Sequence, residues 1–270
     1  MTMLSGLPKK IIGLTILLMV LIPAIVLSAK KTPRVLIFTK MKGYVHKTLP
    51  GKLTNLKEVL LQHHFIVDDT DDASIFNDDS LKRYSAIIFL DCSGNLFDES
   101  QKTAFVNYMK SGGGWIGIHA APIAEKEWDW YDKLIGTRFA GHPWVQEATL
   151  TLTDPKHPIT KHLPASWKRS DEWYFWTKPL EDVHVLINVS ETRWHGEGIV
   201  ETGTKAGPVP DINSEKAIVA AHPIAWCHDY AGGRAFYTSM GHFEDAMKEP
   251  EMQMLIVNAI NWAAKIEVKN

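Results

Sequence analysis

Cysteine is scarce in this chain of 270 residues. The two that it has, Cys92 and Cys227, provide neither a disulfide framework nor a thiolate cluster for a metal, and we expect them to stay unpaired. The chain also has no large excess of positive or negative charge. Its formal net charge is -2 at pH 7, which gives no support for a nucleic-acid partner. Internal repeats and low-complexity tracts are missing as well, so repeat architectures have no support.

Long apolar runs are absent except near the N-terminus. Lys9 and Lys10 precede the run from Ile11 to Leu27, and the small residues Ser28 and Ala29 follow it. This is the layout of a secretory signal peptide, and the run is somewhat short for a membrane span of about 20 residues. We therefore expect residues 1–29 to direct export, to the periplasm or out of the cell, and residues 30–270 to form one domain. The alternative is an uncleaved anchor, the one route by which the chain would contact a membrane.

Apolar strands alternate with amphipathic helices in the first half of the chain, which predicts a mostly parallel sheet covered on both faces. After residue 147 the alternating pattern of 149–153 indicates antiparallel or mixed strands. The expected fold class is thus α/β, with a mostly parallel central sheet and added antiparallel strands in the C-terminal half. The strands are expected at 34–39, 65–67, 86–90, 115–118, 149–153, 183–189, 217–221 and 235–238, and the main helices at 52–64, 98–110 and 252–264.

Ligands of such sheets bind beyond the carboxyl ends of the strands, which directs attention to the loops that begin at Lys40, Asp91 and His119. The segment 112–122 is the most informative, because glycines lead into an apolar strand and His119 follows, flanked by small residues. This is the layout of a nucleophile elbow, in which a tight turn exposes one side chain above the sheet. The pattern predicts a functional role for His119.

Other polar residues stand near predicted strand ends or in loops. His142 lies between a glycine and a proline, Asp171 and Glu172 precede Tyr174, and His242 follows the strand at 235–238. Each pattern alone is weak, but together they predict a cluster of histidines and carboxylates at one edge of the sheet.

The order of these motifs resembles the ThuA-like (trehalose utilisation) family over about residues 34–265. The resemblance implies a flavodoxin-like fold, related to class I glutamine amidotransferases, and a role in handling sugars, often as oxidised 3-keto intermediates. Amidotransferases of that fold carry a cysteine at the apex where His119 stands here, so glutamine hydrolysis by a thiolate is not expected. The matching pieces are His46 after the first strand, 112–120, 139–143, 171–174, His222-Pro223 with Trp226, and 233–237 running into Gly241-His242.

Three hypotheses follow from these residues. In the first, the protein is a hydrolase, lyase or isomerase that acts on a keto-sugar or glycoside, since imidazoles can take and return a proton near neutral pH. Trp128, Trp144 and Trp173 would suit the apolar faces of sugar rings, although core packing is the ordinary role of tryptophan. The catalytic candidates are His119, His142, Glu172 and His242, and the candidates for substrate binding are His46, Asp171, Tyr174, His222 and Arg234.

In the second hypothesis, His119, His142 and His242 bind a divalent metal such as zinc, with a carboxylate completing the set. No local spacing such as H-E-x-x-H supports this, so the ligands would have to converge from separate loops. In the third, the chain is a non-catalytic module that binds a sugar or a partner, since a fold does not fix a function. The sequence does not decide among these three hypotheses. It also does not identify the exact substrate or show whether the protein forms a homo-oligomer.

Overall fold

The computed structural model describes residues 32–177, 180, 182–190, 192–194, 198–200, 217–219 and 222–266. The chain divides into two units, Met1–Lys31 and Thr32–Asn270, and the architecture below is that of the second. The predicted export segment, 1–29, lies outside the described residues. Within the described residues, no helix has the length and apolar character needed to cross a membrane.

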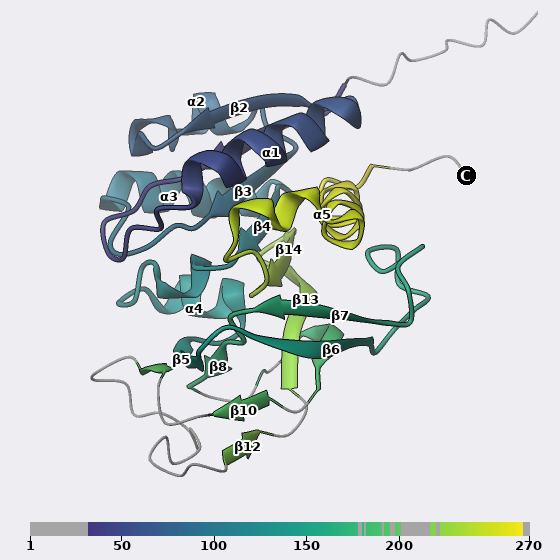
Figure 1. Cartoon of the computed structure of the whole chain (residues 1–270). Coiled ribbons are helices and arrows are strands. Elements are labelled where there is room, and N and C mark those ends of the chain that lie inside the picture. Colours follow the sequence, from purple (N-terminus) through teal and green to yellow (C-terminus); the bar gives the residue numbers. More distant parts are fainter. Residues whose placement is uncertain are drawn as a thin grey trace, which may run out of the picture. The chain divides into compact units, whose positions relative to one another are not determined.

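A nine-stranded sheet organises the domain, in the order β2-β1-β3-β4-β14-β13-β9-β6-β7 (Figure 1). The first five strands of this order are parallel to one another, and the last four run antiparallel to their neighbours. The expected fold class is therefore confirmed. The parallel strands are β2 (Ile66–Thr70), β1 (Arg34–Phe38), β3 (Ala86–Leu90), β4 (Gly114–Ile118) and β14 (Gly233–Thr238); the others are β13 (His222–Tyr230), β9 (His184–Val189), β6 (Gln146–Leu152) and β7 (Ser166–Asp171).

Two smaller sheets accompany the large one. β5 (Phe139–Pro143) pairs with β8 (Phe175–Trp176) and β11 (Gly198–Val200), and β10 (Thr192–Trp194) pairs with β12 (Ala217–Val219). β5 matters for function because it carries His142.

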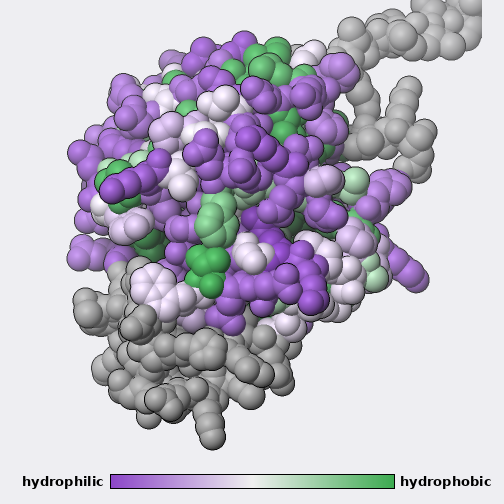
Figure 2. All heavy atoms as spheres, viewed as in Figure 1, coloured by the Kyte–Doolittle hydropathy of each residue, from purple (hydrophilic) through white to green (hydrophobic). Residues whose placement is uncertain are grey.

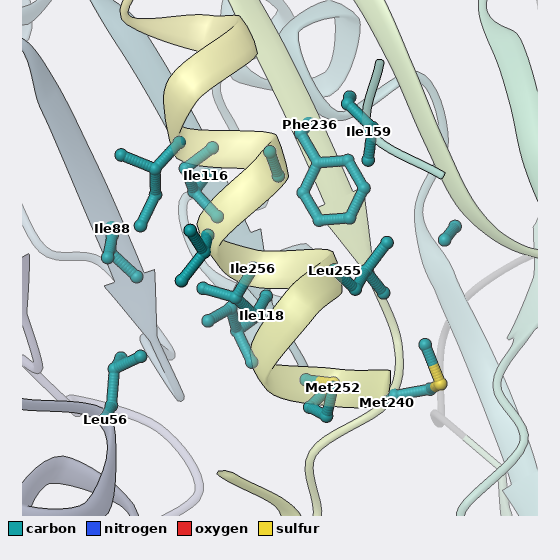
Figure 3. Close-up of a cluster of buried hydrophobic side chains, with 14 of the residues drawn as sticks. Leu56, Ile88, Ile116, Ile118, Ile159, Phe236, Met240, Met252, Leu255 and Ile256 are labelled. Carbon is teal, nitrogen blue, oxygen red and sulfur yellow. The ribbon is translucent and has the colours of Figure 1, made fainter. Parts of the chain in front are cut away.

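Helices cover both faces of the large sheet because side chains along a strand alternate between faces. α1 (Leu49–Gln62) and α5 (Pro250–Ala263) pack on the face that presents Ile88 and Ile116, as Figure 3 shows for α5. α2 (Asp78–Leu81), α3 (Glu99–Lys110) and α4 (Asp129–Ile135) pack on the face that presents Phe89 and Trp115. Hydrophilic residues cover most of the outer face seen in Figure 2.

Helix ends follow local sequence signals. Asp98 caps α3 and forms a capping box with Gln101, so this helix begins within a residue of its predicted start. Proline in the first turn starts α1 and α5, and both helices begin two or three residues before the predicted position. α4 is a helix that the sequence analysis missed, because its seven residues are too few to show a periodic pattern.

The chain turns sharply where β3 and β4 end. Asp91 and His119 have φ angles of 56° and 54°, in the left-handed region that residues other than glycine seldom adopt. The predicted turn at His119 is therefore present, but its apex side chain is fully buried and not exposed as an elbow would have it. Cys92, beside the first of these turns, is buried like Cys227, and both are free thiols, as expected.

Candidate functional site

A cavity of about 520 Å³ opens at the carboxyl ends of the parallel strands. Its wall comes from the loops after β1, β3 and β4, from β5 and from the segments after β7 and β14. These include the three loops that the sequence analysis singled out. The cavity is lined by Lys42, Gly43, Tyr44, His46, Ser93, Gly94, Asn95, Ile123, Lys126, Phe139, His142, Glu172, Tyr174 and His242.

The Glu172 carboxylate stands at the centre of a histidine cluster. Its Oε2 atom lies 3.1 Å from Nδ1 of His242, 3.5 Å from Nε2 of His142 and 3.5 Å from Nε2 of His119. The structure thus brings together all four predicted catalytic residues, from four separate segments of the chain.

His119 lies beneath the cavity floor rather than in its lining, with a side chain that is 0% exposed. Its Nδ1 is 2.8 Å from the carbonyl oxygen of Ser239, and a carbonyl only accepts, so Nδ1 carries the proton and donates. When the ring is neutral, Nε2 has a lone pair, which accepts a hydrogen bond of 2.9 Å from the Tyr174 hydroxyl. A ligand in the cavity would therefore contact the lining residues rather than His119.

His142 has the same tautomer for the same reason. Its Nδ1 lies 2.8 Å from the carbonyl oxygen of Pro143 and donates to it, which leaves the Nε2 lone pair directed at Glu172. Burial lowers the pKa of His142, and this favours the neutral ring. A lone pair and a carboxylate oxygen thus face each other without a proton between them.

Glu172 and His242 form the charged part of the cluster. Burial works to raise the pKa of Glu172, but its contacts with His119, His242 and His142 outweigh burial and hold that pKa well below the usual range. Burial works to lower the pKa of His242, but the hydrogen bond and the charge of Glu172 raise it. The carboxylate is therefore ionised at neutral pH, and His242 is its nearest proton donor.

Asp171 points away from the cavity, although we expected it to bind substrate. It is fully buried, and its carboxylate accepts hydrogen bonds from the backbone of Gly241 (2.8 Å) and His242 (3.2 Å) while pairing with Arg169 (3.0 Å). Because neighbouring residues of an extended chain face opposite sides, Glu172 and Tyr174 reach the cavity and Asp171 does not. Its role is to position the loop that carries His242.

His46 completes the cluster from the loop after β1. Its ring centre is 4.9 Å from that of His119 and 6.0 Å from that of His242, and its side chain is 5% exposed. Burial, followed by the neighbouring His119 and Lys52, lowers the pKa of His46 to about 2. Among the described residues, Nδ1 of His46 has no hydrogen-bond partner.

Two predicted substrate contacts are wrong for a ligand in this cavity. Arg234 lies at the start of β14, at the amino ends of the parallel strands and away from the cavity. There it donates to the carbonyl oxygen of Trp262 (2.8 Å), and its guanidinium lies over the indole ring of the same residue. His222 packs its ring against Phe175 at 4.7 Å and is outside the cavity lining. A sequence shows that a residue is near one end of a strand, but the direction of that strand depends on its partners.

The predicted tryptophan platforms are also not found in this cavity. Trp173 is fully buried in the core, and neither Trp128 nor Trp144 belongs to the described lining. The aromatic lining instead comes from Tyr44 and Phe139. The sequence analysis missed these two residues, together with Lys42, Ser93, Asn95 and Lys126. All of them except Phe139 follow a predicted strand, which was a usable signal.

Comparison with known proteins places this geometry in context. The family model described as ThuA, trehalose utilisation, matches residues 34–263. A ThuA-like protein from Bacteroides uniformis is 29% identical, with a TM-score of 0.67 over 87% of this chain and 93% of that one. A ThuA-like protein from Parabacteroides merdae is 21% identical, with a TM-score of 0.67 over 89% and 92% of the two chains.

A more distant likeness concerns the fold alone. The chain matches 32% of a β-galactosidase from Rahnella sp. R3, with 12% identity over 88% of this chain and a TM-score of 0.53. No relative was found among curated proteins. The family match spans almost all of the described domain and ties it to a carbohydrate-related role. On this evidence the chain belongs to the ThuA, or trehalose utilisation, family.

Proposed function

We propose that this protein is an enzyme that converts a carbohydrate, in the form of an oxidised keto-sugar, by proton transfer at the Glu172 cluster. The observation that carries the proposal is one carboxylate oxygen within 3.1–3.5 Å of three imidazoles at the base of a cavity. Its volume falls in the range of about 300–1,000 Å³ that is typical of ligand sites. The family's link to trehalose utilisation supports a sugar as the ligand.

The lining residues suit a keto-sugar. A hydrogen on the carbon beside a carbonyl is acidic enough for a positioned base to remove, and Glu172, His142 and His242 are the candidates for taking and returning that proton. Tyr44 and Phe139 offer ring faces to the apolar side of a sugar, and the exposed amide of Asn95 offers hydrogen bonds to hydroxyls. Proton exchange, elimination and isomerisation all begin with this step.

The test is incubation with a panel of oxidised and unoxidised disaccharides, followed by NMR and mass analysis of the products. We expect turnover of an oxidised sugar, and we expect Glu172→Gln to lower kcat by about 100-fold or more, as loss of a general acid or base does. Glu147→Gln, which changes an exposed carboxylate paired with Lys168, is the matched control and should keep full activity. Sugar binding without any product over long incubation would instead identify a binding module.

We also propose that the protein is exported. The support is the sequence alone: a basic pair, an apolar run and small residues at 28–29. Fractionation of cells, with N-terminal sequencing of the protein recovered, tests this. Export predicts a periplasmic or secreted form that lacks about the first 29 residues, and a full-length cytoplasmic form would contradict it.

A further inference from the structure

The base of the cavity holds several nitrogen and oxygen atoms with lone pairs and few hydrogen atoms to bond them. His119 uses its ring proton on Ser239, so its Nε2 offers a lone pair, and His142 does the same after donating to Pro143. Nδ1 of His46 is buried and has no hydrogen-bond partner among the described residues. Glu172 adds carboxylate oxygens to this set. Buried lone pairs and a negative charge directed at one point are stabilised by a cation.

The distances among His119, His242 and Glu172 fit the coordination sphere of a small transition-metal ion, and His46 has to move closer to complete it. Bonds of about 2.0–2.1 Å in a tetrahedral site place neighbouring ligand atoms about 3.3 Å apart. Nε2 of His119 and Nδ1 of His242 are 3.4 Å apart, and Oε2 of Glu172 is 3.5 Å from the first and 3.1 Å from the second. The ligand atoms of His46, His119 and His242 all lie within 4.8 Å of one another.

We propose that His46, His119 and His242 bind a divalent metal ion of the zinc class, with Glu172 as the acidic group beside it. This set differs from the one expected from the sequence, because His46 replaces His142. Among the described residues, only these three histidines form such a group of ligand atoms. The bond from His119 to Ser239 has the outer-shell role seen in metal sites, where the second ring nitrogen donates to a carbonyl and fixes the tautomer.

The metal would give the proposed function an electrophile. His46, Glu172 and His242 line the cavity, so an ion held by the histidines would face a bound ligand and polarise its carbonyl oxygen. In this respect the inference rests on the proposed function. Metal binding itself does not, because it is measured in the absence of sugar. The Tyr174 hydroxyl, which donates to Nε2 of His119 here, would give up that bond when the ion binds, and Nδ1 of His242, which donates to Glu172 here, would release its proton.

The test is a titration of chelator-treated protein with Co²⁺, followed by visible absorption spectroscopy and by competition with Zn²⁺. We expect one equivalent of Co²⁺ to bind with the intense bands of a four-coordinate site, and Zn²⁺ to displace it. His46→Ala should weaken binding by more than the roughly 10- to 100-fold that follows loss of an outer-shell partner. His142→Ala is the matched control, and it should bind the metal within a few-fold of the wild-type affinity.

Three outcomes would overturn the assignment: no stoichiometric metal on the wild-type protein, normal binding by His46→Ala, or equal losses in the His46 and His142 variants. Circular dichroism in the presence of chelator checks that each variant is folded, and His46→Gln takes the place of His46→Ala if the latter is not. Metal binding without sugar turnover would leave this site standing and remove the proposed function. Turnover that persists in chelator would leave the proposed function standing and remove the electrophilic role assigned to the metal.

Discussion

At the scale of single residues, the most consequential contact outside the cluster is a buried ion pair. Lys52 of α1 and Asp91, at the turn after β3, are both 0% exposed and pair with each other. Lys52 also donates a hydrogen bond of 3.0 Å to the carbonyl of Gly241, next to His242. One ammonium group therefore joins a helix, a strand end and the loop that carries a cluster residue. Neither residue was singled out from the sequence as a functional candidate.

We predict that Lys52→Met destabilises the fold by about 3–5 kcal/mol, because it leaves the Asp91 carboxylate buried without its counter-charge. Urea unfolding at neutral pH measures the change. Lys57→Met is the matched control on the same helix. It breaks a partly exposed pair with Asp69 and should cost no more than about 1 kcal/mol. Equal effects of the two substitutions would show that burial of the first pair has no energetic consequence.

At the scale of elements, Arg138 holds together the loop that follows β4. It donates to the backbone carbonyls of Pro122 (3.3 Å), Ala124 (2.5 Å) and Glu125 (2.6 Å). The Glu125 carboxylate in turn accepts from the backbone of the loop after β3, at Leu96 and Phe97. Arg138 and Glu125 thus hold together the loops after β3 and β4, which form two walls of the cavity.

We predict that Arg138→Met loosens this loop without unfolding the sheet. Backbone amides in residues 123–126 should exchange with solvent at least several-fold faster, because the carbonyls lose their charged donor and local opening becomes easier. Hydrogen exchange followed by mass spectrometry measures this, with the peptide that covers β3 as an internal reference. Arg83→Met, which removes an exposed donor to Ser80, is the control. Unchanged exchange in 123–126 would show that Glu125 alone holds the loop.

At the scale of the whole molecule, partly buried histidines link stability to pH. Burial lowers the pKa of His228 and of His157 below the ordinary value of 6.5, and both lie away from the histidine cluster. The unfolded chain therefore binds protons at these residues at a higher pH than the folded one does. Their contribution to stability is present above about pH 6.5 and is lost as the pH falls toward the folded-state pKa values.

We predict that the free energy of unfolding falls as the pH is lowered from about 7 to about 5, in the presence of chelator. His228→Gln, which keeps a donor for the Leu134 carbonyl, should make this dependence shallower. His63→Gln, a change at an exposed histidine, should leave it as it is. Urea titrations over this pH range measure all three proteins. Stability that is constant or rises on acidification would contradict the assignment.

Much of the fold was predictable because its signals are local. The buried strand 86–90 reads as a continuous apolar run, and the capping residues around Asp98 fix where a helix begins, whatever the rest of the chain does. The turn at His119 was predictable for the same reason, because small neighbours and a strand before the turn are properties of a short segment. Sequence also indicated that His142, Glu172 and His242 belong near strand ends or in loops.

Which polar groups meet is decided only by the tertiary structure, because it depends on the direction and the neighbours of each strand. β14 runs parallel to β4, so the segment after its carboxyl end brings His242 close to His119. Arg234, at the amino end of β14, lies on the opposite side from the cavity. Burial is equally non-local: it places His119 beneath the cavity and leaves a lone pair of His46 without a partner. The sequence by itself determined the layers and the turn at His119, and the packing of distant segments decided which three histidines surround Glu172.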